Sequence, residues 1–327
     1  MPRDGALGSG TTVAAFLRDE WLPAVQSTVR HTTYFNYVSQ VECHFVPWLG
    51  DRALGDLDGR TINRFYSTLL SEGRRDGDGG LAASTVRRLH AALHKALKDA
   101  VRWGYLDSNP VDAADPPKLR AEGPREMSTW SAAELRRFLE FVREDRLFPL
   151  LFVLATTGMR RGEALGLRWC DVDLGAGDLA VRQNLVEAGR ALRVSSPKTS
   201  RGRRLVAIDR RTCEVLEAHR ARFPQTQSTD LVFGCCFSSA VSATAVTKRF
   251  RKLVERAGLP RIRLHDLRHT HATLALEAGV HPKIVSERLG HSTVSLTLDV
   301  YSHAVPHMQR DAADEIARVL FGDAETV

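Results

Sequence analysis

The sequence lacks the cysteine pattern, the apolar runs and the leader that would mark a disulfide-rich, zinc-binding or membrane protein. The five cysteines are Cys43, Cys170, Cys213, Cys235 and Cys236. Their number is odd and no two of them form a CxxC pair, so the sequence supports neither a disulfide framework nor a cysteine zinc site. No apolar run approaches the ~18 residues that a transmembrane helix needs. Residues 1–16 contain no continuous apolar segment, so we expect no secretory signal and no membrane partner, and we predict a cytoplasmic protein.

Lysine is scarce as well. All but seven of the 46 basic residues are arginine, and the lysines stand at positions 95, 98, 118, 198, 248, 252 and 283. This bias is typical of a GC-rich bacterial genome, and it makes a lysine within a motif easier to notice. The formal net charge is nevertheless +7, which fits a polyanionic partner because Lys and Arg displace counterions from a phosphate backbone.

A chain of 327 residues suits two domains, and the first is predicted to be a helical bundle over residues 11–106, after a disordered head at 1–10. Apolar residues recur there at spacings of three and four, which places each group on one face of a helix. The groups are Val13, Phe16, Leu17 and Trp21; Tyr34, Tyr37, Val38, Val41 and Phe45; Ile62, Phe65, Tyr66, Leu69 and Leu70; and Val86, Leu89, Leu93, Leu97 and Val101. Amphipathic helices with short connections indicate a bundle.

Residues 107–122 are predicted to link this bundle to a second domain at 123–327, because they carry Asn109-Pro110 and Pro116-Pro117 among scattered charges. The second domain begins with the capping-box spacing of Ser131 and Glu134 and continues with helices that break near Gly158.

Residues 179–186, 191–194 and 204–208 alternate and are rich in branched side chains, which predicts a three-stranded antiparallel sheet. The pattern after residue 209 is helical and ends in a tail helix at 307–321. The predicted fold is therefore mainly α with a small antiparallel β-sheet, and the second domain is α+β.

Two basic segments of the second domain are candidate phosphate sites. In TGMRRGE, Gly158 ends one helix and Arg160 begins the next, so free N–H groups lie beside a guanidinium; the alternative is an ordinary glycine break with surface arginines. PKTSRGRR begins at residue 197 and forms a basic hairpin tip that can enter a DNA groove and deliver the Lys198 ammonium to a leaving oxygen. Its alternative is a solvated loop.

The segment LHDLRHTH, from residue 264, has two competing interpretations. His265 and Arg268 are three apart and share a helical face that can grip one phosphate. His265 and His269, with Asp266 between them, loosely resemble the HExxH zinc motif. The acid is Asp rather than Glu, and the intervening arginine opposes a cation, so we expect no metal.

Two further candidates are weak when they stand alone. His291 follows a glycine in LGHS and is by itself typical of a solvated residue at a helix end. Tyr301 lies in LDVYSH, and a lone tyrosine on an apolar helix is usually a core residue with a bonded hydroxyl.

In their order along the chain, TGMR, PKTSRGRR, HDLRHTHAT, LGHS and LDVYSH resemble the catalytic domain of tyrosine recombinases, the phage integrase family. The resemblance covers roughly residues 128–303, and the bundle is similar, less specifically, to the SAM-like core-binding domain of that family. It implies a site-specific DNA recombinase or integrase, a DNA strand-transferase that needs neither ATP nor a metal or other cofactor.

The resemblance also implies roles for single residues. Tyr301 would attack the scissile phosphate and form a 3′-phosphotyrosyl bond, while Arg160 and Arg268 would bind the non-bridging oxygens. Lys198 would protonate the departing 5′-oxygen, His265 would help to take the phenolic proton, and His291 would donate a hydrogen bond to the phosphate. Glu163 would orient a neighbouring group. The basic hairpin would contact DNA through Arg201, Arg203 and Arg204.

The partners that the resemblance implies are double-stranded recombination sites and further copies of the chain. Family members act as homotetramers on synapsed DNA and exchange strands through a Holliday junction, and an accessory directionality factor is a further partner that the resemblance allows. The tail stripe of Met308, Ala312, Ile316, Val319 and Leu320 is expected to dock on a neighbouring protomer; the alternative is folding onto its own domain.

Other interpretations of the whole chain stay open at this point. About ten residues precede the bundle, whereas many integrases carry an arm-binding domain there, so the chain is either a simpler two-domain recombinase or an incomplete integrase. A type IB-like DNA relaxing enzyme and a non-catalytic DNA-binding protein would share this fold, and the HExxH-like spacing leaves a zinc hydrolase as the remaining alternative. We place the protein in a bacterial cytoplasm, associated with the nucleoid, where it would integrate, excise or resolve a mobile element or replicon.

Overall fold

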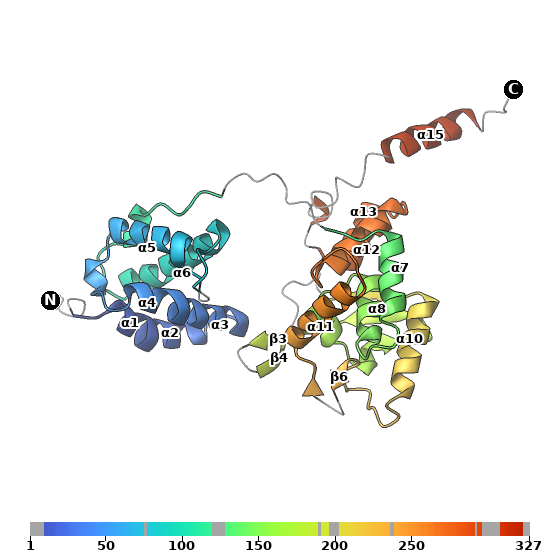
Figure 1. Cartoon of the computed structure of the whole chain (residues 1–327), viewed down its shortest axis with the longest axis horizontal. Coiled ribbons are helices and arrows are strands. Elements are labelled where there is room, and N and C mark those ends of the chain that lie inside the picture. The colour runs from blue at the N-terminus through green and yellow to red at the C-terminus, as the bar shows by residue number, and fades with distance from the viewer. Residues whose placement is uncertain are drawn as a thin grey trace. The chain divides into compact units, whose positions relative to one another are not determined.

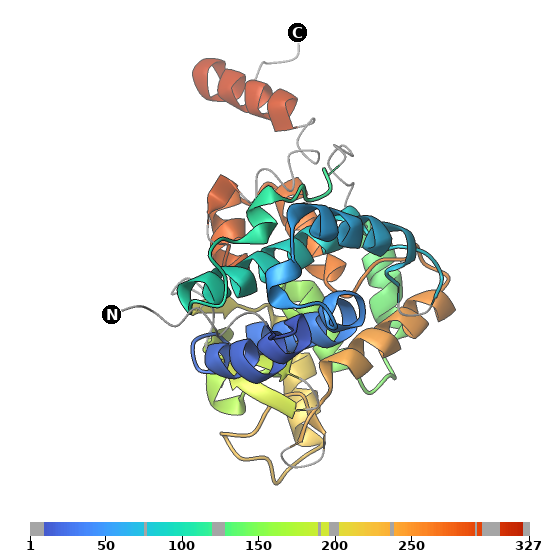
Figure 2. The same ribbon diagram turned by 90° about the vertical axis from the view of Figure 1, so that its left-hand side faces the viewer.

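The structure is a computed structural model of the chain and describes residues 10–74, 77–119, 128–188, 191–195, 203–235, 239–291, 293–295 and 308–322. The predicted disordered head therefore lies outside the described residues except for Gly10. The chain forms two compact units, Met1–Arg125 and Glu126–Val327, which are described separately below and can be followed by colour in Figures 1 and 2.

The N-terminal unit consists of helices. Two of its long segments change from α-helical to π-helical and back without a break. Its elements are α1 (Val13–Ala15), η1 (Phe16–Trp21), α2 (Leu22–Gln26), α3 (His31–Gln40), η2 (Val41–Phe45), α4 (Val46–Leu49), η3 (Leu54–Asp56), α5 (Gly59–Glu72), α6 (Ala83–Arg102) and η4 (Pro110–Ala113). The predicted apolar stripes form the core of this unit, with the exception of Leu70, which is exposed, and Tyr34, Tyr37, Val38 and Val101, which are partly buried.

A buried carboxylate joins two helices of this unit. Asp99 on α6 accepts a hydrogen bond from the Trp21 indole at 3.0 Å and pairs with Lys95 at 2.5 Å and Arg102 at 3.1 Å. A buried charge costs several kcal/mol unless it is paired and hydrogen-bonded, and these partners supply that compensation.

The predicted linker begins later than residue 107. Val111 and Ala114 are buried against the bundle, because their spacing of three places both on one side of the short 3₁₀ turn η4. Asn109 caps that turn by accepting from the Val111 amide at 3.1 Å, and the Asp115 amide donates to Asn63 at 2.8 Å. At least the first half of the predicted linker therefore belongs to the N-terminal unit.

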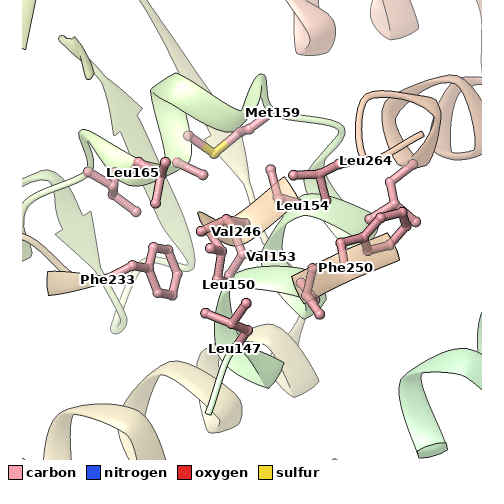
Figure 3. Packing of buried hydrophobic residues seen from close by; sticks show 14 of the residues in the cluster. Leu147, Leu150, Val153, Leu154, Met159, Leu165, Phe233, Val246, Phe250 and Leu264 are labelled. Carbon is pink, nitrogen blue, oxygen red and sulfur yellow. The ribbon is translucent and has the colours of Figure 1, made fainter. Parts of the chain in front are cut away.

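The second unit is built around a helix, α8 (Phe148–Thr157), that is apolar and largely buried. Its helices are α7 (Ala132–Phe141), α8 (Phe148–Thr157), α9 (Arg161–Leu165), η5 (Trp169–Asp171), α10 (Arg210–Ala221), α11 (Ala243–Arg256), α12 (Asp266–Glu277), α13 (Pro282–Leu289) and α15 (Met308–Phe321). α8 is apolar around its circumference and contacts α7, α9, α10 and α12, which is typical of a central core helix. Figure 3 shows Leu150, Val153 and Leu154 of α8 packed among side chains from other elements, including Phe250 and Leu264.

The capping box that the sequence predicts is confirmed at the start of α7. The Ser131 hydroxyl accepts from the Glu134 amide at 3.3 Å, and the Glu134 carboxylate accepts from the Ser131 amide at 2.8 Å. None of the described helices is long and apolar enough to cross a membrane.

The mainly helical fold with a small antiparallel sheet is confirmed, but the predicted pairing of the strands is wrong. β1 (Val172–Asp173), β2 (Asp178–Val181) and β5 (Arg204–Ala207) form one antiparallel sheet, whereas β3 (Asn184–Ala188) pairs separately with β4 (Ala191–Ser195). A third pair joins β6 (Gly234–Cys235) and β7 (Ser239–Ala240).

The predicted strand 179–186 is divided because its second half packs on α9. The Gln183 side chain donates to the Gly166 carbonyl at 2.7 Å, and a Cβ at Gly162 would lie 2.1 Å from the Asn184 side-chain oxygen. The glycine permits a close approach that pulls β3 away from the β1–β2–β5 sheet.

Candidate active site

The turn between α8 and α9 requires glycine for two reasons. Gly158 ends α8 with φ +63°, in the left-handed region, which confirms the predicted helix break. A Cβ there would lie 2.6 Å from Leu289 Cδ2 and 2.7 Å from His271 Cδ2. The turn is therefore pressed against α12 and α13, and it sets Arg160 at the first position before α9.

Arg160 is held on one side and remains accessible on the other. Its Nη1 donates to Glu163 Oε1 at 2.8 Å and its Nη2 donates to the Gly290 carbonyl at 3.0 Å, while its amide donates to Glu163 Oε2 at 3.0 Å. The side chain is still 42% exposed. The arrangement orients a guanidinium without consuming all of its donors.

Glu163 is a buried carboxylate between two arginines. Burial by itself would raise the pKa of Glu163, but the hydrogen bonds and charge of Arg204, together with Arg160, hold it below its ordinary value. The carboxylate is therefore ionised at neutral pH and serves as an anchor rather than as an acid. This geometry agrees with the orienting role that the sequence predicts for Glu163.

Arg204 lies inside the protein, which the sequence does not predict. Its side chain is 7% exposed, its two terminal nitrogens donate to Glu163 at 2.9 and 3.2 Å, and its Nε donates to the Arg288 carbonyl at 2.7 Å. The guanidinium of Arg204 is committed inside the protein, and its predicted DNA contact stays a prediction. The neighbouring Arg203 is exposed, as a DNA-contacting residue would be.

Arg268 on α12 joins the ends of two other helices. It is buried, and its Nη1 donates to the Gly158 carbonyl at 2.9 Å and to the Leu289 carbonyl at 2.8 Å. These carbonyls belong to the C-terminal ends of α8 and α13, where the helix dipole favours a cation. Arg268 thereby draws the α8–α9 turn, α12 and the segment after α13 together.

Three histidines near these arginines are held neutral. Burial lowers the pKa of His265 to about 4, helped by His269 and Arg268, and burial lowers the pKa of His291 to about 4, helped by Arg268 and Arg160. The pKa of His269 is also lowered by burial, and its ring lies edge-to-face on His265 with 5.2 Å between centroids. At pH 7 each imidazole therefore has one N–H donor and one acceptor nitrogen.

Three of the predicted site residues, Tyr301, Lys198 and Arg201, lie outside the described residues. In the rival zinc interpretation, Asp266 would be the acidic residue between His265 and His269. The carboxylate of Asp266 already accepts hydrogen bonds from Arg263 at 2.8 and 3.0 Å. Within the described ranges, no group of three or more His, Cys, Asp or Glu side chains is placed to hold a metal ion.

Sequence reasoning missed two residues behind the site, His271 and Arg288. His271 Nδ1 lies 3.1 Å from the Ala155 carbonyl, and Arg288 donates from Nε to His271 Nε2 at 3.3 Å. Burial lowers the pKa of His271 to about 4, so it accepts this bond as a neutral ring. His271 stands three residues after Arg268 on the same helix, which was a usable signal, whereas nothing in the local pattern distinguished Arg288.

A cavity of about 340 Å³ adjoins this cluster, between β5 and the end of α13. Its lining residues are Arg203, Arg204, Lys283, Ser286, Glu287, Gly290, His291 and Val294. The cavity therefore lies directly beside His291 and the Arg204 anchor.

Comparison with known proteins yields a consistent group. The model of the phage integrase family matches residues 130–308, more than half of the chain, and the model of the N-terminal SAM-like domain of phage integrases matches residues 15–70. A tyrosine recombinase XerC-like protein of Caldanaerobacter subterraneus subsp. tengcongensis is 29% identical over 280 residues, covering 78% of this chain and 69% of that protein. The ICEBs1 integrase of Bacillus subtilis is 28% identical over 250 residues, covering 74% of this chain and 67% of the relative.

Solved structures share the fold. The Tn1549 transposon integrase in complex with a circular intermediate DNA aligns with a TM-score of 0.74 at 20% identity, covering 94% of this chain and 100% of that chain. A lambda integrase tetramer bound to a Holliday junction aligns with a TM-score of 0.65 at 20% identity, covering 86% of this chain and 78% of that chain.

Proposed function

Because this chain belongs to the phage integrase family of tyrosine recombinases, which are DNA strand-transferring enzymes, we propose that it cleaves and rejoins specific DNA sites through Tyr301. One observation supports the proposal most strongly. Arg160, Arg268 and His291 come from three separate segments, and hydrogen bonds to the Gly158, Leu289 and Gly290 carbonyls draw those segments to one place. The unit so formed would hold a single phosphate.

The proposed binding step uses the two arginines. Arg160 offers an accessible guanidinium, and the planar fork of its N–H donors can bind the two non-bridging oxygens of a phosphate diester. Arg268 is buried in the DNA-free chain, so its role as a second phosphate ligand requires that its cover be displaced when DNA binds. Together they would stabilise the additional negative charge that develops on the phosphate oxygens in the transition state.

The proposed chemical step transfers one phosphoryl group and two protons. The Tyr301 oxygen attacks phosphorus and displaces the 5′-oxygen, leaving a 3′-phosphotyrosyl bond; the phenolic proton passes to His265 and the 5′-oxygen receives a proton from Lys198. His265 suits the acceptor role because it is neutral before DNA binds, and the charge of a bound phosphate would raise its pKa toward neutrality. The phosphoester bond energy is retained, so attack by a 5′-hydroxyl reverses the step without ATP.

We further propose that four copies act on two synapsed sites and pass through a Holliday junction. α15 supports an exchange of tails, because Ile316, Val319, Leu320 and Phe321 are 60–84% exposed and form an apolar surface that a neighbouring protomer would cover. Deleting residues 304–327 should then impair synapsis more than binding of a single site. An accessory factor would set the direction of the reaction.

The decisive experiment uses nicked suicide substrates made from the ends of the DNA element that carries the gene. The wild-type chain should form a covalent protein–DNA adduct that survives denaturation, and peptide mapping should place the DNA on Tyr301. The Tyr301→Phe variant should bind the same DNA without an adduct. An adduct that persists in this variant would overturn the assignment, and DNA binding without any wild-type adduct would favour a non-catalytic protein. Adduct formation in EDTA would exclude the zinc hydrolase.

The role of Lys198 has its own test. Lys198→Ala should slow cleavage of normal DNA about a hundredfold, because the 5′-oxygen would leave without a proton. A substrate with sulfur at the 5′-bridging position needs no such proton and should restore most of the rate. Failure of this rescue would remove Lys198 from the acid role.

A further inference from the structure

We propose that Arg204 is a positioning residue that fixes the phosphate-binding Arg160 through Glu163 and ties the strand after the Lys198 loop to the end of α13. The inference rests on the proposed function, because Arg160 matters only if it holds a phosphate. It replaces the DNA contact that the basic hairpin sequence predicts for Arg204 with a role inside the protein.

Arg204 shares its anchor with Arg160. Glu163 Oε1 accepts from Arg160 Nη1 at 2.8 Å and from Arg204 Nη1 at 3.2 Å, while Glu163 Oε2 accepts from Arg204 Nη2 at 2.9 Å and from the Arg160 amide at 3.0 Å. The guanidinium fork of Arg204 therefore binds both oxygens of the Glu163 carboxylate, and the carboxylate in turn orients Arg160. Without Arg204, Glu163 would keep only Arg160, whose side chain is 42% exposed.

The burial of the Glu163 and Arg204 charges makes the orientation of Arg160 depend strongly on Arg204. Glu163 is 5% exposed and Arg204 is 7% exposed, whereas Arg160 is 42% exposed. A buried carboxylate that loses its buried cation becomes easier to protonate, since desolvation disfavours its charged form. A protonated Glu163 has one oxygen fewer to offer as an acceptor, so Arg160 would lose part of the contact that orients it.

Arg204 also belongs to a reciprocal clamp between β5 and α13. Arg204 Nε donates to the Arg288 carbonyl at 2.7 Å, and Arg288 Nη1 donates back to the Ala207 carbonyl at 2.7 Å. Arg288 additionally reaches the Thr156 carbonyl of α8 at 3.1 Å. Lys198 precedes Arg204 by six positions, so the clamp fixes a strand that begins six residues after Lys198.

A lysine cannot reproduce this arrangement. One ammonium is a compact point charge, whereas the guanidinium fork reaches two carboxylate oxygens and, through Nε, a backbone carbonyl in a different direction. The comparison of Arg204→Lys with Arg204→Gln therefore separates the charge of the residue from its geometry.

The first experiment measures single-turnover cleavage of the nicked substrate at saturating protein, together with DNA affinity and thermal unfolding. Arg204→Gln should cleave about 50- to 100-fold more slowly while its Kd for DNA stays within about threefold of wild type. Arg204→Lys should recover only part of the rate and remain about tenfold slow. Arg210→Gln is the matched control, because Arg210 pairs with Glu214 on the exposed face of α10, and it should behave as wild type. Unchanged cleavage by Arg204→Gln, or a loss confined to DNA affinity, would overturn the inference.

The second experiment asks whether Arg204 acts through Glu163, which a general structural role would not require. Arg204→Gln should lose cleavage rate as pH falls from 8 to 5 more steeply than wild type, because Glu163 then protonates within that range. Adding Glu163→Gln should remove this extra pH dependence, and the double variant should cleave within about twofold of Glu163→Gln alone. Multiplicative losses in the double variant would show that the two residues act independently and would overturn the inference.

A third measurement does not depend on catalysis. The Glu163 carboxyl can be titrated by carbon NMR in the whole chain without DNA, and its pKa should be higher in Arg204→Gln than in wild type and in Arg210→Gln. An unchanged pKa would overturn the inference even if the wild-type chain cleaved no DNA. Absence of a wild-type adduct combined with a raised Glu163 pKa would instead overturn the proposed function while leaving the arrangement of Arg204 and Glu163 supported.

Discussion

The N-terminal unit buries Asp99 between two cations and the second unit buries Glu163 between two cations, and these two sites differ in where the cations come from. In the N-terminal unit, Asp99 pairs with Lys95 and Arg102, which lie on the same helix and keep much of their surface in solvent. In the second unit, Glu163 pairs with Arg160 nearby and with Arg204 from a strand 41 residues away, and Arg204 is buried.

The difference separates a site that stabilises a fold from one that builds a functional surface. Lys95 and Arg102 stand four and three residues from Asp99, so the helix itself brings them together and the cluster locks Trp21 to α6. Arg204 meets Glu163 because β5 pairs with β2 and α13 packs beside β5. The long-range pair leaves Arg160 oriented and exposed, which is the condition for ligand binding.

The largest expected effect comes from removing the accessible arginine of the second cluster. Arg160→Ala should slow single-turnover cleavage by more than about a hundredfold, because a preorganised donor to the transition state is lost. Its thermal unfolding should change little, since the side chain is 42% exposed. Thermal unfolding as easy as that of a core variant, or normal DNA cleavage, would contradict the proposed difference between the two clusters.

Two glycines at helix ends differ in the same way, since one is required only by its local backbone conformation and the other also by contacts with distant segments. Gly104 follows α6 with φ +82°, and a Cβ added to it would meet nothing within 4 Å, whereas Gly158 follows α8 with φ +63° and its added Cβ would clash with Leu289 and His271. Gly158→Ala should cost about 3 kcal/mol of unfolding free energy, because backbone strain and overpacking add. Gly104→Ala should cost about 1 kcal/mol from strain alone. Equal losses in urea unfolding would contradict this ranking.

Removal of the Asp99 carboxylate should lower the stability of the N-terminal unit and leave the rate of DNA cleavage nearly unchanged. Asp99→Ala should destabilise the N-terminal unit by about 2–3 kcal/mol, because the buried Trp21 N–H loses its acceptor. Hydrogen exchange in urea, followed peptide by peptide, would locate the loss. Cleavage measured at saturating DNA should stay within a few-fold of wild type, and a hundredfold loss there would show that Asp99 serves the site.

The last expected effect is a loss of stability of the second unit as pH falls. His265, His271 and His291 have pKa values of about 4 in the folded chain, below the ordinary value for histidine, so the unfolded chain binds protons first as pH falls. The second unit should therefore be fully stable above about pH 6.5 and lose stability between pH 6.5 and 4. His271, the most buried, should account for up to about 3 kcal/mol. His271→Gln should flatten the dependence, and an equal slope in wild type and variant would contradict the assignment.

Local patterns predicted much of this molecule correctly. The helical stripes, the capping box at Ser131 and the break at Gly158 depend on residues within about one helical turn, so the sequence order contains the necessary information. The predicted strand pairing was wrong because it depends on how β2, β3 and β5 meet α9. The burial of Arg204 was not predicted, since it depends in the same way on how β5 meets α13. The predicted roles of Tyr301 and Lys198 remain predictions.

The sequence by itself determined the family, the helical segments and most strand segments, because motif order and periodicity are properties of the chain. It also supplied the candidate residues for holding a phosphate. Only the tertiary structure decided which arginines remain available. Arg160 is exposed while Arg204 and Arg268 are buried, although all three are identical side chains in basic segments. A guanidinium binds whichever carboxylate or helix-ending carbonyl lies within its reach, and that choice is made by distant segments when they pack.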